Sequence, residues 1–264
     1  MRKWIKNQAK YRLAHFFAAR KQTLWDSIRQ AEAIQEDVEC LKNMLPGKRD
    51  ITADGFRSYL DDSFQADCLM ESVERHREII GKGWEEKLSG KPFAAMVFCY
   101  AALRELKPTV VIETGCSTGW TSSLLLFALH CNASGHLFSI DIPPKAGHLS
   151  MDWTLPADLS PGFLVPDGLR DRWTLILGNT RDHMVPLLKE QREIGVFYHD
   201  SDHTYEHMMW EYTTAWPFLQ KGGLLISDDI GWNTAFWDFA VGINRTPVIH
   251  SSNSNFGAIS KGLN

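Results

Sequence analysis

The chain has 264 residues, of which 44% are hydrophobic, and it carries a formal net charge of -4. A chain of this size can bury a sizeable core, and its weakly acidic charge argues against nucleic acid as a partner. The five cysteines are scattered without a Cys-x-x-Cys pair, which argues against disulfides and a zinc–sulfur site and favours reduced thiols in the cytoplasm. No apolar run approaches the roughly 18 residues of a membrane span.

The first part of the chain is strongly basic. Residues 1–25 contain seven lysine and arginine side chains and no acidic one. Apolar residues recur there at helical spacing, so we predict a basic amphipathic helical extension over residues 1–50 and a main domain with a helical cap over residues 51–264. The apolar face of this helix is expected to pack against another surface. The alternatives are the main domain, a second subunit of a homo-oligomer, and an anionic membrane that residues 1–30 contact.

The remaining elements divide into a helical start and an alternating region. Residues 1–45 are predicted to be mostly helical, residues 46–60 to form a loop and residues 61–84 to form a helical cap. A helix follows from residue 91 and stops before Pro108. Beyond it, strand and helix signals alternate, which predicts an α/β fold with a mostly parallel sheet of about seven strands. The predicted strands are residues 109–113, 136–141, 173–177, 195–200 and 223–228, with a weaker pair at 246–250 and 256–260.

A proline-rich segment interrupts this alternation. Five prolines fall within residues 143–171, which are predicted to form a long loop. Loops of this length are usually functional, so the segment is interpreted as a substrate lid or as a structural insertion.

The most informative stretch joins a predicted strand to a predicted helix. Residues 110–112 are β-branched, Glu113 ends the run, and a glycine-spaced turn leads into a helix from Trp120. Such a turn lets the backbone approach a ligand, and the helix start offers unpaired N–H groups, so the element is a nucleotide-binding unit or an ordinary strand-to-helix turn. A second apolar run ends at Asp141, where an acid either accepts the ribose hydroxyls of an adenosine or is a solvated loop residue.

Five segments together carry a family resemblance, namely residues 110–119, 138–141, 178–181, 198–205 and 221–229. They occur in the order found in class I S-adenosylmethionine-dependent methyltransferases, and the chain looks most like the small-molecule group called family 24, which is similar to macrolide sugar O-methyltransferases and to proteins named cephalosporin hydroxylase. The resemblance covers about residues 85–264. It implies a Rossmann-like class I sheet, S-adenosylmethionine as cofactor, and methyl transfer to a hydroxyl of a sugar or glycosylated metabolite.

The resemblance also implies a set of cofactor-binding residues. The chain departs from the family at Asn179, where the resembled enzymes usually have aspartate, although asparagine can still donate or accept a hydrogen bond. The implied cofactor-binding residues are Glu113, Gly115, Ser117, Thr118, Gly119, Asp141 and Asn179.

Carboxylates follow two later strands of the predicted sheet. Asp200 ends the strand at 195–200, and Asp228 and Asp229 end the strand at 223–228. The carboxyl ends of parallel strands lie at one edge, where ligands bind, so the three acids converge if these strands are neighbours. Three clustered carboxylates repel one another, and a hard cation such as Mg2+ relieves the repulsion. In the alternative interpretation, Asp200 caps the next helix and the acid pair shapes the cofactor pocket.

The metal interpretation also has family support. The resembled sugar O-methyltransferases hold a divalent metal with acids that match Asp200, Asp228 and Asp229. The first acid of their pair is often glutamate, so Asp228 is a shorter ligand than the family usually has.

Histidines surround the first of these acids. His203 lies three residues after Asp200, and a histidine can remove the proton of an acceptor hydroxyl near neutral pH. The resemblance places a catalytic histidine here, whereas the alternative is a structural hydrogen bond. His203 and His207 are spaced four apart, but the absence of an evident third nitrogen or sulfur ligand argues against zinc. His199 is predicted to face the opposite side of the strand and to pack in the core.

Two tryptophans follow the acid pair. Trp232 and Trp237 either wall an acceptor pocket by stacking on a ring or pack in the core.

The combined prediction is a magnesium-assisted S-adenosylmethionine-dependent O-methyltransferase that acts on a small molecule. A hydroxylase-type enzyme is one alternative, although no two-histidine, one-carboxylate iron site is evident. A non-catalytic S-adenosylmethionine-binding scaffold or regulator that uses the basic helix is the other.

Overall fold

The computed structural model of the chain describes residues 31–45, 47, 50–65, 69, 91–142, 159–250 and 253–263. Three predicted segments lie wholly or mostly outside these residues: the basic helix of residues 1–30, residues 66–84 of the helical cap, and residues 143–158 of the long loop. Membrane contact or self-association through residues 1–30 therefore stays a prediction.

A seven-stranded sheet forms the centre of the fold, with the strand order β3-β2-β1-β4-β5-β7-β6. Strands β1 to β5 are parallel to one another, whereas β7 pairs antiparallel with both β5 and β6. This topology confirms the predicted Rossmann-like, mostly parallel sheet. The strands are β1 (Val110–Thr114), β2 (His136–Asp141), β3 (Trp173–Leu177), β4 (Ile194–His199), β5 (Leu219–Ser227), β6 (Val248–His250) and β7 (Asn253–Ser260).

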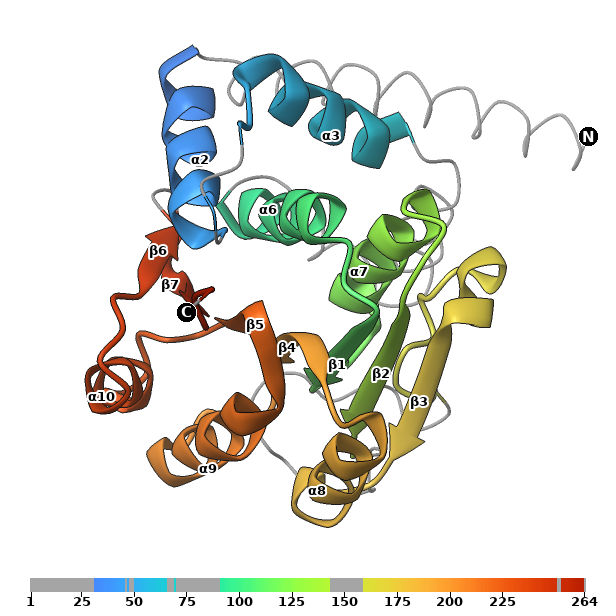
Figure 1. Cartoon of the computed structure of the whole chain (residues 1–264). Helices are drawn as coiled ribbons and strands as arrows, with labels where there is room; N and C mark the ends of the chain where they lie inside the picture. Colours follow the sequence, from blue (N-terminus) through green and yellow to red (C-terminus); the bar gives the residue numbers. More distant parts are fainter. Residues whose placement is uncertain are drawn as a thin grey trace, which may run out of the picture.

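Separate groups of helices cover the two faces of the sheet (Figure 1). Successive side chains of a strand point to opposite faces, so Val111 packs in the core of one layer and Ile112 in the core of the other. The first layer contains α2 (Ala31–Met44), α3 (Ala53–Gln65), α6 (Lys91–Leu106) and α7 (Trp120–Cys131), and the second contains α8 (Thr180–Gln191), α9 (Tyr205–Ala215) and α10 (Ala235–Gly242). Two short 3-10 helices, η2 (Asp167–Arg172) and η3 (Trp216–Phe218), connect the elements.

Helix α3 corrects one prediction, because residues 53–60 were expected to belong to a loop. The Thr52 hydroxyl accepts a hydrogen bond from the N–H of Gly55 at 3.1 Å, and Phe56 is only 2% exposed. An N-terminal side-chain acceptor and a buried aromatic side chain stabilise a helix despite the turn-forming residues Asp54 and Gly55. The loop prediction was wrong because it weighed local propensity and not tertiary packing.

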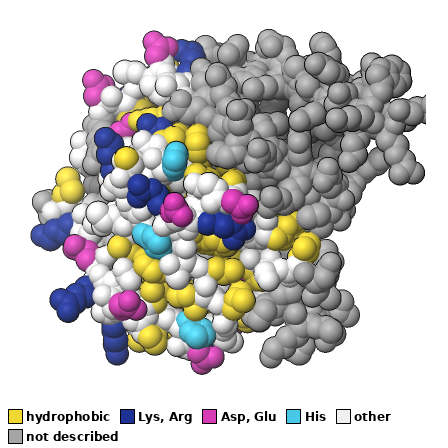
Figure 2. All heavy atoms as spheres, turned by 90° about the vertical axis from the view of Figure 1, so that its right-hand side faces the viewer, with side chains coloured by type: hydrophobic (Ala, Val, Ile, Leu, Met, Phe, Trp, Pro, Cys, Tyr) yellow, Lys and Arg dark blue, Asp and Glu magenta, His cyan; other side chains and the backbone are white. Residues whose placement is uncertain are grey.

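The described surface agrees with the weak net charge. On the face seen from the β3 side, basic and acidic side chains are interspersed in the described region (Figure 2). This part of the surface therefore lacks the extended basic patch that binds a nucleic-acid backbone. None of the helices in the described ranges combines the length and apolarity that a bilayer crossing requires.

Candidate functional site

A tight turn joins β1 to α7 and lies directly against the loop after β4. Gly115 and Gly119 have φ angles of 78° and 88°, a region that favours glycine. The N–H of Gly115 donates to the carbonyl of Ile140 at 2.9 Å. A Cβ atom at Gly115 would lie 1.9 Å from the carbonyl oxygen of Asp200, so the turn and this loop are in van der Waals contact through their backbones.

Asp141 binds this turn from the end of the neighbouring strand β2. Its Oδ2 atom accepts hydrogen bonds from the backbone N–H groups of Cys116 at 2.9 Å and Ser117 at 2.5 Å. The carboxylate therefore shapes the turn in addition to the predicted role of accepting ribose hydroxyls. The turn is held on its other side by residues 162–164, because Gly162 and Leu164 donate to the carbonyls of Ser117 and Thr118 at 2.7 and 2.9 Å.

Glu113 is buried beneath the turn. Its Oε2 atom accepts from the hydroxyls of Ser122 at 2.6 Å and Ser139 at 2.5 Å, and the side chain is fully enclosed. Burial raises the pKa of Glu113 to about 7, and the charge of Asp141 acts in the same direction, whereas the two serine hydrogen bonds oppose the shift. Glu113 therefore supports the turn from the core. Because its side chain is enclosed, the predicted contact with the cofactor would involve the backbone of Glu113.

Replacement of Glu113 by glutamine is expected to remove a pH-dependent loss of stability. A carboxyl group with a folded pKa near 7 and an unfolded pKa of 4.5 binds more protons in the native state, so it stabilises the fold at low pH and loses this contribution between pH 4.5 and 7. The loss is about 3 kcal/mol when the shift is converted to free energy. Urea unfolding should be measured for wild type and Glu113→Gln at several pH values. Between pH 4.5 and 7, the free energy of unfolding of wild type should fall relative to that of the variant. Glu190→Gln, at an exposed position of α8, is the control and should show no such trend.

Asn179 lies after β3, at the start of α8. Its side-chain oxygen accepts a hydrogen bond from the N–H of Arg181 at 2.8 Å, so it is the N-cap of that helix. The side chain is exposed at the same sheet edge as Asp141. The structure thus assigns Asn179 a capping role, and contact with the cofactor stays a prediction.

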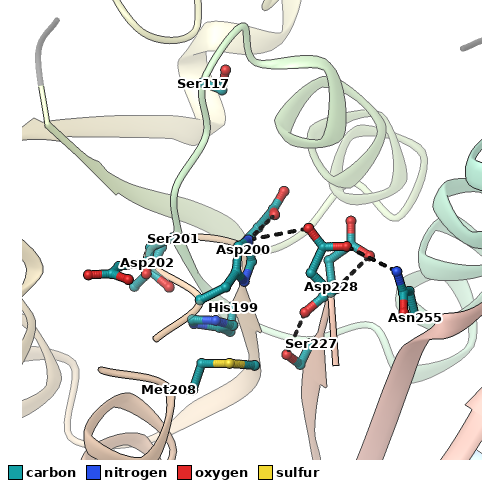
Figure 3. A network of polar contacts seen from close by, with 12 residues as sticks. Ser117, His199, Asp200, Ser201, Asp202, Met208, Ser227, Asp228 and Asn255 are labelled. Atoms are coloured by element: carbon teal, nitrogen blue, oxygen red, sulfur yellow. Dashed lines mark hydrogen bonds and ion pairs between the residues drawn. The ribbon is translucent and has the colours of Figure 1, made fainter. Parts of the chain in front are cut away.

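The three predicted metal ligands lie at the ends of neighbouring strands. The parallel pairing of β4 with β5 aligns His199 with Ser227, so Asp200 and Asp228 follow at the same level. Figure 3 shows Asp200 and Asp228 near each other above His199, while Ser117 of the turn lies apart from them. Desolvation raises the pKa of Asp200 well above its usual value, and the charge of Asp228 adds to the shift. Desolvation and the charge of Asp229 raise the pKa of Asp228 to about 6.

His203 lies between two of these acids. Its Nε2 atom is 3.7 Å from Oδ1 of Asp200 and 3.6 Å from Oδ2 of Asp229, and its side chain is 12% exposed. Burial lowers the pKa of His203 to about 4, and the nearby His199 contributes in the same direction. The imidazole is therefore neutral at pH 7 and has a lone pair that can accept a proton.

The strand ends that carry Asp200, Asp228 and Asp229 suit a hard cation, since they offer carboxylate oxygens. Desolvation raises the pKa of all three acids, and repulsion from neighbouring carboxylates adds to the shift for Asp200 and Asp228. Within the described part of the chain, however, no three His, Cys, Asp or Glu side chains are arranged as a formed metal-binding group. A bound cation would thus require these side chains to close around it.

A residue that sequence analysis missed lies directly beneath the site. Glu211 of α9 is fully buried and accepts hydrogen bonds from the strand ends and from its own helix. One of these partners is His199, which was predicted to pack in the core and does so as part of this polar network. His207 is another, whereas His203 precedes the helix, so the two histidines do not share a helical face. The sequence pattern that could have identified Glu211 is an acid that lies next to Tyr212 on an otherwise apolar face of α9.

The comparisons with known proteins agree with this architecture. Residues 112–230 match the family Methyltransf_24, described as a methyltransferase domain. The fold is similar to that of the SAH-bound Podospora anserina methyltransferase PaMTH1, with 15% identity, a TM-score of 0.52, and coverage of 80% of this chain and 96% of that chain. It is also similar to apo CalS11, a TDP-rhamnose 3'-O-methyltransferase in calicheamicin biosynthesis, with 15% identity, a TM-score of 0.50, and coverage of 78% and 92%. No curated protein matches the chain.

At such low identity the two solved structures establish the fold alone, and the family match covers the turn, the acids and His203. Residues 112–230 are therefore identified as a methyltransferase domain similar to family 24, on a seven-stranded, mostly parallel sheet of the Rossmann-like type.

Proposed function

We propose that this methyltransferase transfers a methyl group from S-adenosylmethionine to a hydroxyl of a small molecule, namely a sugar or a glycosylated metabolite. The observation that carries the proposal is the neutral, partly buried imidazole of His203, which lies between Asp200 and Asp229. Asp200 also adjoins the turn at Gly115. A proton acceptor next to a cofactor turn is what O-methylation requires.

The proposed reaction is a direct displacement at the methyl carbon. The acceptor oxygen forms a bond to the methyl carbon while the bond from that carbon to sulfur breaks, so the sulfonium becomes a neutral thioether. The hydroxyl proton passes to Nε2 of His203. Gly115 allows the cofactor turn to lie against the loop that carries His203, which supports close alignment of the two reactants.

Magnesium assistance belongs to the same proposal. Asp200, Asp228 and Asp229 would hold the ion, which when bound supplies a Lewis acid for the acceptor oxygen. Loss of turnover on chelation, with recovery on addition of Mg2+, would support this assignment. Turnover that is indifferent to chelation would restrict the three acids to shaping the pocket.

Replacement of Asp141 by asparagine tests the cofactor site. We expect wild type to bind S-adenosylmethionine and the variant to bind it about 10- to 100-fold more weakly, because hydrogen bonds to a charged group contribute roughly 1.5–3 kcal/mol. Isothermal titration calorimetry on the full chain measures the difference. Asp167→Asn, at an exposed position of η2, is the control and should bind like wild type. A wild-type chain that binds no S-adenosylmethionine would refute the proposed function, and binding without turnover would favour a regulatory scaffold.

Trp232 offers a wall for the acceptor. Its ring is 50% exposed and lies 5.3 Å from the ring of His203, at an interplanar angle of 49°. The neighbouring Asn233 donates a hydrogen bond to the carbonyl of His203 at 2.8 Å, which holds this loop next to the proton acceptor. Trp232 is therefore placed to stack on a ring of the acceptor.

Substitution of Trp232 by alanine is expected to raise KM for the acceptor by about 3- to 10-fold, the range given by a stacking contribution of roughly 0.5–1.5 kcal/mol. Steady-state kinetics should be measured with an acceptor found in a panel of glycosides and ring alcohols. Trp237→Ala is a matched control, since Trp237 is 42% exposed but lies on α10, where no contact with His203 is seen. Equal effects of the two substitutions would argue against stacking on Trp232.

A further inference from the structure

One buried carboxylate connects the strand ends that carry the site. Glu211 is 0% exposed, and each of its oxygens contacts two side chains. Oε2 accepts from the Thr114 hydroxyl at 2.6 Å and lies 2.7 Å from Nδ1 of His199. Oε1 accepts from the Ser201 hydroxyl at 2.9 Å and lies 2.8 Å from Nε2 of His207. Glu211 thereby joins the end of β1, the end of β4 and the loop after β4.

The ionisation of Glu211 determines the donors in this network. Burial alone would raise its pKa, but the hydrogen bonds from His199 and His207 outweigh burial and hold the pKa well below the usual range. The group is therefore a carboxylate, which only accepts hydrogen bonds, so Nδ1 of His199 carries a proton. This bond fixes the orientation of the His199 ring.

The oriented ring of His199 packs edge to face against His203. Their centroids are 5.3 Å apart with an interplanar angle of 88°, and Tyr212 packs against His199 at the same distance and 76°. His203 is held on its other side by Trp232 and through its carbonyl by Asn233. The position of the His203 imidazole therefore depends on the ring that Glu211 orients.

A second route leads from Glu211 to the cofactor turn. Thr114 is the last residue of β1 and directly precedes Gly115, and its carbonyl accepts from the N–H of Asp200 at 2.8 Å. The same carboxylate that orients His199 is thus hydrogen-bonded to the residue that directly precedes the turn. An apolar side chain would fill this interior position at lower desolvation cost, so stability alone is a weak reason for a carboxylate here.

We propose that Glu211 is a positioning residue that acts through His199 to fix the His203 imidazole relative to the cofactor turn. This inference rests on the proposed function, because His203 is the proton acceptor there. Glu211 itself touches neither reactant: it lies in the layer beneath the strand ends and orders the residues that do.

Three variants of the full chain separate positioning from general stabilisation. Glu211→Gln removes the charge and replaces one acceptor by an amide donor, so it breaks part of the network. His199→Asn keeps an amide N–H for Glu211 but removes the ring that contacts His203. Tyr212→Phe is the matched control, because it removes a buried hydrogen bond of α9, the 2.7 Å contact with Ser227, and keeps the aromatic ring against His199.

The measurements are crystal structures with S-adenosylmethionine, calorimetric affinity for S-adenosylmethionine, and kcat with an acceptor that wild type methylates. In Glu211→Gln and His199→Asn we expect the His203 ring to be displaced or to occupy more than one rotamer. The expected fall in kcat is about 10- to 100-fold, because a misplacement of about 1 Å costs this much. Affinity for S-adenosylmethionine should stay within about threefold in His199→Asn, which leaves the hydrogen bond from Thr114 to Glu211 in place. Tyr212→Phe should keep both the ring position and kcat.

An unchanged His203 ring and kcat in His199→Asn would overturn the inference, as would an equal loss of kcat in Tyr212→Phe. If Glu211→Gln does not fold, His199→Asn decides the question, because it retains the hydrogen bond to the carboxylate. A wild-type chain that methylates nothing in the acceptor panel would refute the proposed function instead. In that case the crystal structures still show whether Glu211 holds His203 in place.

Discussion

Replacement of His203 by asparagine is expected to lower kcat by about 10²- to 10⁴-fold, the range that general base catalysis contributes. The imidazole is the neutral nitrogen base between Asp200 and Asp229, and asparagine has no lone pair of comparable basicity. The affinity for S-adenosylmethionine should stay within about twofold, because the loss falls on the chemical step.

Steady-state kinetics with an accepted hydroxyl substrate and calorimetry with S-adenosylmethionine measure the two quantities separately. His130→Asn is the control, since His130 is exposed in the last turn of α7 and should leave both unchanged. An undiminished kcat in His203→Asn would mean that another group, or solvent, removes the proton.

Replacement of Gly115 by alanine is expected to be the most damaging glycine-to-alanine substitution among the described glycines. The new Cβ atom would lie 1.9 Å from the carbonyl oxygen of Asp200 and 2.8 Å from Cα of Ser201, and both are backbone atoms that a rotamer change cannot move. The φ angle of 78° adds strain of roughly 1–3 kcal/mol for a non-glycine residue. We expect a loss of stability of several kcal/mol and loss of S-adenosylmethionine binding.

Urea unfolding and calorimetry test this expectation. Gly168→Ala is the matched control, because a Cβ atom there meets nothing within 4 Å and its φ angle is ordinary. Wild-type affinity and stability in Gly115→Ala would show that the turn can move away from the loop after β4.

Much of the fold followed from local patterns. Strands β1, β4 and β5 are near-continuous apolar runs because nearly all of their residues are buried, and such runs are visible in a single sequence. Helix α3 was missed because its stability comes from packing Phe56 into the first layer, which local propensity does not report. Residues 1–30 lie outside the described chain, so their predicted amphipathic helix is untested.

Some residues of the candidate site could be predicted from the sequence, and others could not. Asp200, Asp228 and Asp229 come together because parallel strands end at one edge, and that rule needs only strand order. Glu211 was not predicted, since its partners come from three separate segments and only the folded chain brings them together. Asp141 was predicted as a ligand for ribose, but its bonds to the turn depend on backbone N–H directions that residue types do not encode.

The close approach of Gly115 to Asp200 has a consequence for protein engineering. Exchanging a single surface loop to alter substrate scope presumes that the loop is an independent part of the fold. Here the turn at residues 115–119 and the loop at 200–204 share a backbone contact with no space for a side chain, so neither can change shape alone. A chimaera would therefore need to take both segments from the same donor protein. It would also need the donor residue that corresponds to Glu211.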